Sequence, residues 1–142
     1  MPADNAFVLD AAFLKEAARG DIDIINMIQQ FDAERVALVI PALAATAAAI
    51  DVGGTPERVA VLRGICRLDS ARFAGLVDFD DTTELARMRL AVEALPDLWD
   101  VQAAEQAIMR SCPVLTVNYG LWKSAVHEAS GELTVVEVAE LD

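Results

Sequence analysis

The chain predicts an α/β fold, a three-layer α/β/α sandwich with a mostly parallel central sheet. Short apolar segments alternate along the sequence with segments whose apolar residues recur at helical spacing. Such alternation favours parallel strands joined by helices that cover both faces of the sheet. Neither an internal repeat nor a low-complexity linker interrupts the 142 residues. We therefore expect a single domain over residues 1–142.

Five short segments are the expected strands. The first is continuously apolar, which is typical of a buried central strand, and the second is rich in β-branched residues. Gly75 weakens the third, because glycine has no side chain to pack within a sheet. The five segments are 6–9, 36–40, 73–79, 114–117 and 133–138.

Seven segments are the expected helices, and several carry a start or stop signal. Asp10, Asp21 and Thr55 stand at N-cap positions, where a side-chain oxygen can accept from a free backbone N–H group. Asp81 or Thr82 is the expected cap of the fifth helix. The segments are 11–19, 21–31, 42–50, 56–68, 82–95, 97–110 and 120–129.

Composition excludes several classes of function. Eleven Lys and Arg residues face 23 Asp and Glu residues, and the net charge of -12 disfavours binding to RNA or to an anionic membrane. Cys66 and Cys112 are too few for a disulfide framework or a four-thiolate site, and we expect two small buried thiols. The single histidine, His127, excludes a two-histidine metal site within one protomer.

The longest uncharged stretch is 36–50, which contains Pro41. It is too short to span a bilayer, which takes roughly 20 residues. The first residues carry no basic segment of the kind that opens a secretory signal. These features predict a cytoplasmic protein without a membrane partner.

Polar residues follow the expected strands at the edge where parallel sheets bind ligands. Asp10 comes directly after the first strand, Asn118 follows the segment 114–117, and Asp100 lies in the first turn of a helix. Each also has a purely structural explanation. Asp10 can cap a helix, Asp100 can interact with the helix dipole, and Asn118 can be a turn residue.

Four motifs in order resemble the PIN domain family, the nuclease domain of bacterial VapC-type toxins. They are AFVLDAAFL, VALVIPALAATAAA, LPDLWDVQAAEQAI and CPVLTVNYGLW, and they cover nearly the whole chain. The resemblance implies an α/β/α sandwich that gathers acidic residues at the carboxyl edge of a parallel sheet. It also implies that these residues hold Mg²⁺ or Mn²⁺, which activates a water for cleavage of an RNA phosphodiester.

Two of the four family acids are replaced in this chain. The first family aspartate corresponds to Asp10 and the third acid to Asp100. The family glutamate falls on Ala47, or on Thr46 with a one-residue shift, and Asn118 stands in place of the last aspartate. Fewer carboxylates weaken cation binding and remove the field that a two-metal clamp needs.

The resemblance thus implies catalytic residues Asp10 and Asp100, with Asn118 as a third metal ligand. Thr116 could orient a metal-bound water, and Asp97 could substitute for a lost acid or simply cap its helix. No nucleic-acid-binding residues are identified, because the basic residues are spread along the chain.

Two main functions stay open, beside a third possibility, a small-molecule site at the same sheet edge, for which the chain has no glycine-rich phosphate loop. The first is a divergent PIN-domain protein with a degraded ribonuclease centre, which binds Mg²⁺ or Mn²⁺ weakly and retains at most residual RNA cleavage. The alternative is a non-catalytic interaction or dimerisation module. A homodimer is expected, and a toxin-like role would add an antitoxin, which the sequence does not identify. The candidate contact residues, for which core packing is the default explanation, are Ile24, Ile25, Ile28, Val59, Leu62 and Ile65.

Overall fold

The computed structural model describes residues 5–141. Its strands are β1 (Ala6–Leu9), β2 (Ala37–Pro41), β3 (Ala71–Ala74), β4 (Val114–Thr116) and β5 (Val135–Glu137). Its helices are α1 (Ala11–Ala18), α2 (Ile22–Ala33), α3 (Ala42–Asp51), α4 (Ala60–Cys66), α5 (Phe79–Ala91), α6 (Leu98–Arg110) and α7 (Tyr119–Glu128). A short 3₁₀ helix, η2 (Val138–Leu141), follows β5.

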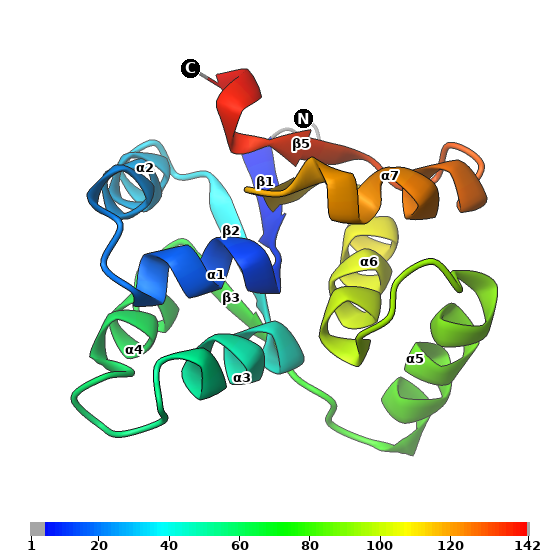
Figure 1. Ribbon diagram of the computed structural model, residues 1–142, viewed down its shortest axis with the longest axis horizontal. Helices are drawn as coiled ribbons and strands as arrows, with labels where there is room; N and C mark the ends of the chain where they lie inside the picture. Colours follow the sequence, from blue (N-terminus) through cyan, green and yellow to red (C-terminus); the bar gives the residue numbers. More distant parts are fainter. Residues whose placement is uncertain (1–4, 142) are drawn as a thin grey trace.

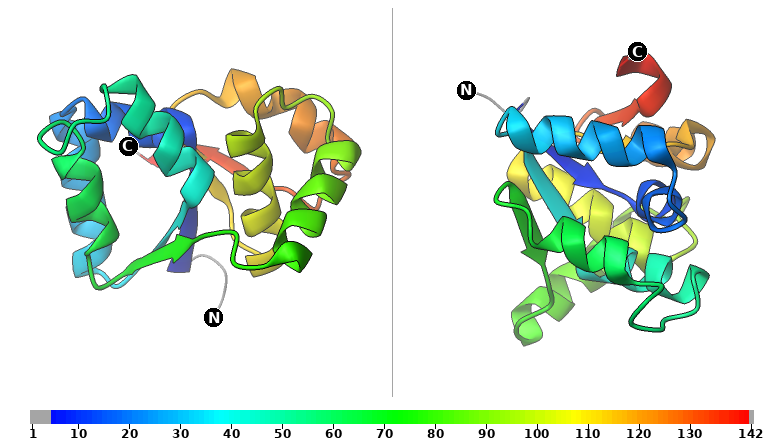
Figure 2. Two further views of the ribbon diagram at one scale, coloured as in Figure 1. Left: turned by 90° about the horizontal axis from the view of Figure 1, so that it is seen from below. Right: turned by 90° about the vertical axis from the view of Figure 1, so that its left-hand side faces the viewer.

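The five strands form one sheet of order β3-β2-β1-β4-β5, and every pairing between them is parallel. Helices α1 to α4 lie on one side of this sheet and α5 to α7 on the other (Figure 1). Figure 2 shows the same two groups from below and from the side. The expected α/β/α sandwich with a parallel sheet is confirmed.

Alternating side chains of the central strand β1 divide the core into two halves. Val8 packs with residues of α5, α6 and α7, whereas Leu9 packs with residues of α1 to α4. Both side chains are fully buried. Because successive side chains of a strand point to opposite faces, a strand covered on both faces is apolar throughout.

Two of the expected helix caps are confirmed. The Asp10 carboxylate accepts from the backbone N–H of Phe13 at 2.8 Å, and Asp21 accepts from the N–H groups of Asp23 and Ile24. Thr55 accepts from the Arg58 amide at 3.3 Å, but a turn follows it and α4 begins later than expected.

The expected strand over 73–79 is wrong, because β3 is Ala71–Ala74 and α5 already begins at Phe79. The register explains the difference. Ala74 pairs with Pro41, the last residue of β2, so the chain beyond Ala74 has no neighbouring strand to pair with. The apolar residues that follow are exposed: Leu76 is 41% and Val77 86% accessible.

The expected bounds and cap of the fifth helix are also wrong. Asp78 caps α5 by accepting from the Asp81 amide at 3.0 Å, in place of Asp81 or Thr82. The helix ends at Ala91, several residues before Leu95. There the Arg89 guanidinium donates to the carbonyls of the segment that follows, those of Val92, Glu93 and Leu95.

The residues considered for dimer contacts lie largely in the core. Ile24, Ile28, Leu62 and Ile65 are buried between α1, α2, α4 and the sheet, while Ile25 and Val59 are partly exposed. Core packing therefore accounts for the burial of four of the six. Cys112 is buried as expected, but Cys66 is only partly buried.

Within residues 5–141, none of the helices combines the length and the apolarity that crossing a bilayer requires.

A buried glutamine joins three elements beside the carboxyl edge of the sheet. The Gln102 side chain, fully buried on α6, accepts from the Leu43 amide in the first turn of α3 at 2.9 Å. Its Nε2 donates to the carbonyl of Ala74, the last residue of β3, at 3.1 Å. One amide therefore fixes the positions of α3 and β3 relative to α6.

We predict that Gln102→Ala lowers the free energy of unfolding by about 2–4 kcal/mol, since it leaves a buried N–H and a buried C=O unpaired and opens a cavity. The control is Gln106→Ala on the same helix, whose side-chain oxygen accepts from Arg110 Nε at 2.8 Å. Urea unfolding curves of both variants measure the difference. An equal, small loss in the two would contradict the bridging role.

Candidate functional site

An open pocket of ≈ 370 Å³ lies where β1 and β4 end and α6 begins. Its polar and aromatic lining consists of Lys15, Glu16, Asp97, Trp99, Asp100 and Asn118. The chain after β4 and the first turns of α1 and α6 converge on this edge because the strands are parallel. Residues distant in sequence thereby meet at the edge where the site was expected.

Asp10 directly precedes Ala11 of the pocket lining but is not itself part of that lining, and its carboxylate is fully buried. Its Oδ1 accepts from the Phe13 amide, and its Oδ2 accepts from Nε1 of Trp122 on α7, both at 2.8 Å. Burial raises the pKa of Asp10. Hydrogen bonds with Thr116, Phe13 and Trp122 stabilise the charged form and partly offset this increase in the pKa. The carboxylate is therefore oriented by donors from two helices.

Asp100 lies near Asp10, but its carboxylate lacks the hydrogen bonds that orient the Asp10 carboxylate. It is 2% exposed, and its Oδ1 has no hydrogen-bond partner among residues 5–141. Burial, followed by the negative charges of Asp10 and Asp97, raises the pKa of Asp100 to about 7. A buried carboxylate in this position needs either a proton or a neighbouring cation.

The other expected site residues lie around this pair. Thr116 is fully buried, and its hydroxyl accepts from the Asn118 amide at 3.1 Å. Asn118 is exposed at the start of α7, where its side chain makes no capping hydrogen bond. Asp97 stands at the N-cap position of α6, yet its side chain makes no capping bond either and lines the pocket.

The two positions considered for the family glutamate do not line this pocket. Ala47 is buried against the core between α1 and α3, and Thr46 is exposed with its hydroxyl bonded to the Ala42 carbonyl. Within the described part of the chain, no group of three or more His, Cys, Asp or Glu side chains is arranged to hold a metal ion. The site therefore offers the buried carboxylates of Asp10 and Asp100, the pocket-lining carboxylates of Glu16 and Asp97, and the amide oxygen of Asn118.

Sequence reasoning missed two side chains at this site. The indole N–H of Trp122 is buried, so it needs an acceptor and finds one in Asp10. Lys15 follows Ala11 by one helical turn and so shares its face of α1, which is turned to the pocket. Its Nζ lies 5.9 Å from the centre of the Trp99 ring.

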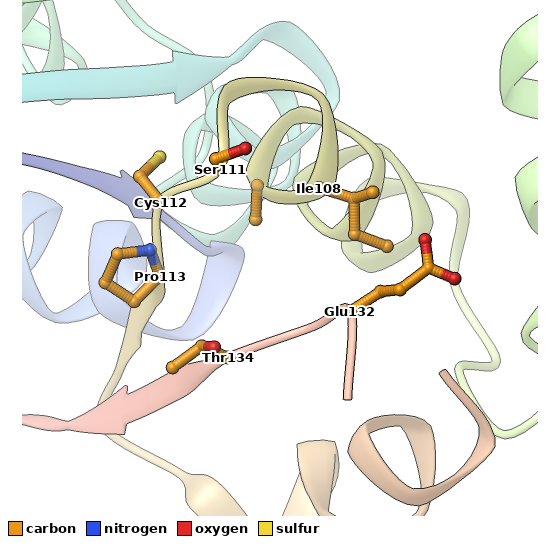
Figure 3. Close-up of a pocket in the computed structure, with 7 residues that line it drawn as sticks. Ile108, Ser111, Cys112, Pro113, Glu132 and Thr134 are labelled. Atoms are coloured by element: carbon orange, nitrogen blue, oxygen red, sulfur yellow. The ribbon is translucent and has the colours of Figure 1, made fainter. Parts of the chain in front are cut away.

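A larger pocket of ≈ 490 Å³ lies at the opposite end of the sheet, before β4 (Figure 3). Ser111, Cys112, Pro113, Glu132 and Thr134 line it. Burial raises the pKa of the Cys112 thiol, which therefore stays protonated and weakly nucleophilic. The buried carboxylates of Asp10 and Asp100 lie at the other pocket, and we therefore regard the pocket beside Asp100 as the candidate site.

We predict that Asp100→Asn flattens the pH dependence of stability. The pKa of Asp100 is higher in the folded state than its ordinary value of 3.8, so the folded state binds the extra proton and the free energy of unfolding falls as the pH rises to about 7. Relative to the variant, the wild type should lose about 3 kcal/mol between pH 5 and pH 8.

Urea unfolding at these two pH values measures the effect, and Asp80→Asn, at an exposed position on α5, is the control. Parallel pH profiles for the wild type and Asp100→Asn would show that burial of this carboxylate does not perturb its ionisation.

In comparisons with known proteins, the chain matches no protein-family model and no curated protein. The resemblance to PIN domains therefore rests on the order and spacing of the four motifs.

Proposed function

We propose that the chain is a divergent PIN-like protein with a degraded ribonuclease centre, in which Asp10 and Asp100 still bind Mg²⁺ or Mn²⁺ weakly. The observation that carries this proposal is the buried Oδ1 of Asp100, which has no hydrogen-bond partner among the described residues and lies near a second buried carboxylate. A divalent cation would neutralise both acids and take up the free oxygen.

The donor set suits a hard cation. Mg²⁺ is commonly held by one or two carboxylates together with waters and substrate phosphates. Asp10 and Asp100 supply the carboxylates, and Asn118 supplies an uncharged amide oxygen on the same pocket wall. The two Asp10 oxygens accept from the Phe13 amide and the Trp122 indole N–H, and a carboxylate has about four lone-pair sites, so these two bonds do not exhaust its acceptor capacity.

A bound divalent cation would supply the Lewis acid for hydrolysis of an RNA phosphodiester. The chain's own residues orient its ligands: Phe13 and Trp122 hold Asp10, and the Thr116 hydroxyl holds the backbone ahead of α7. The uncharged residue at 118 and the loss of the glutamate lower the attraction for the cation. The net charge of -12 also repels an RNA backbone, so any cleavage is residual.

We predict that Mn²⁺ raises the melting temperature of the wild type saturably, because a ligand of the folded state stabilises it. With a millimolar dissociation constant, 10 mM Mn²⁺ should add about 3–5 °C. Asp10→Asn and Asp100→Asn should abolish the shift, whereas Asp80→Asn should keep it. Differential scanning calorimetry measures this, and an undiminished shift in Asp100→Asn would place the cation elsewhere.

We predict that Asn118→Asp tightens Mn²⁺ binding about ten-fold, since it replaces an uncharged amide of the pocket lining with a carboxylate. If the centre is a degraded nuclease, this variant should also gain Mn²⁺-dependent cleavage of single-stranded RNA. A fluorogenic oligonucleotide assay, with the Asn118→Asp/Asp100→Asn double variant as control, measures the gain.

The two functions give different results in these assays. Saturable Mn²⁺ binding that depends on Asp100 supports the degraded centre. Absence of any Mn²⁺ effect on the wild type and on Asn118→Asp would instead favour the non-catalytic interaction module.

A further inference from the structure

We propose that Lys15 is a built-in counter-cation of the pocket, and that its charge sets how strongly the two carboxylates bind a divalent ion. This inference rests on the proposed function, because it concerns the regulation of that same site. Lys15 acts here as a tethered competitor: it offsets the acids when the pocket holds no cation and repels a divalent cation that approaches them.

The position of Lys15 follows from the first helix. Asp10 caps α1, and Lys15 lies one turn after Ala11 on the face of α1 that is turned to the pocket. Its Nζ lies 5.9 Å from the centre of the Trp99 ring, within the range of a cation–π contact. Since Trp99 immediately precedes Asp100 on α6, this contact holds the ammonium at the pocket wall.

Lys15 influences Asp10 and Asp100 through its electric field and not through a direct ion pair. No ion pair within 4.0 Å joins Lys15 to an acid in the described part of the chain. Its positive charge nevertheless lowers the pKa of both Asp10 and Asp100, against the larger effect of burial. The Asp100 Oδ1 thus stays open to a ligand while the ammonium stands nearby.

The neighbouring basic residue does not share this role. Arg19, one turn further along α1, is bound to Asp51 and Glu16 through contacts of 2.8 and 2.9 Å on the surface. Lys15 is the basic side chain that lines the pocket. The second lysine of the sequence, Lys123, lies exposed on α7 outside the pocket lining, and provides a control with the same change in net charge.

The size of the effect follows from Coulomb repulsion across a short distance. A divalent ion at Asp100 would share one pocket with the Lys15 side chain, and salt screens the repulsion between charges at short range only in part. In a partly exposed pocket, that repulsion corresponds to about a ten-fold weakening of divalent binding.

The experiment compares Lys15→Met, Lys15→Arg and Lys123→Met with the wild type. Methionine keeps an unbranched stem of similar length without the charge, and arginine keeps the charge. Isothermal titration calorimetry with Mn²⁺ alone measures the dissociation constant of each protein, and circular dichroism melts verify that each is folded. We expect Lys15→Met to bind Mn²⁺ about ten-fold more tightly than the wild type. Lys15→Arg and Lys123→Met should match the wild type.

The outcomes separate this inference from the proposed function. If the wild type binds Mn²⁺ through Asp100 but Lys15→Met and Lys123→Met bind equally well, the role of Lys15 is overturned and the cation site stands. If neither the wild type nor Lys15→Met binds Mn²⁺, the cation site fails and the inference fails with it. Binding that appears only in Lys15→Met, and is abolished by adding Asp100→Asn, would support both.

Discussion

The burial of two carboxylates beneath the carboxyl edge of one parallel sheet is the constraint on which this structure depends. Asp10 and Asp100 lie close enough for the charge of one to raise the pKa of the other, and both are nearly inaccessible to water. Removing a charge from water is costly unless donors or counter-charges replace the solvent. The surrounding residues supply hydrogen-bond donors to the Asp10 carboxylate, but they supply few donors or counter-charges to that of Asp100.

Two buried polar side chains tie the layers together around this edge. Asp10 caps α1 and receives the indole N–H of Trp122, so one carboxylate joins helices on opposite faces of the sheet. Gln102 similarly joins α6 to the start of α3 and the end of β3. The walls of the pocket are therefore fixed by a few specific hydrogen bonds in addition to apolar packing, which is less directional.

The pocket combines acidic side chains with one lysine, and the proposed weak cation binding depends on the balance between their charges. A site with fewer carboxylates attracts a divalent ion less strongly, but the folded state then also has less repulsion to tolerate without the ion. The positive charge of Lys15 offsets part of that repulsion, since it lowers the pKa of Asp100.

Local sequence signals determined much of the fold. The apolar strands, their alternation with helices, and the caps Asp10 and Asp21 depend on neighbouring residues, and all could be predicted. The strand expected over 73–79 was wrong because its end depends on where β2 stops, which is a property of the pairing. The tertiary structure alone decided that Trp122 bonds Asp10 across 112 positions of sequence and that Lys15 lies on Trp99. Such contacts depend on how separate elements pack. A local pattern of residues does not determine which residues distant in sequence will meet.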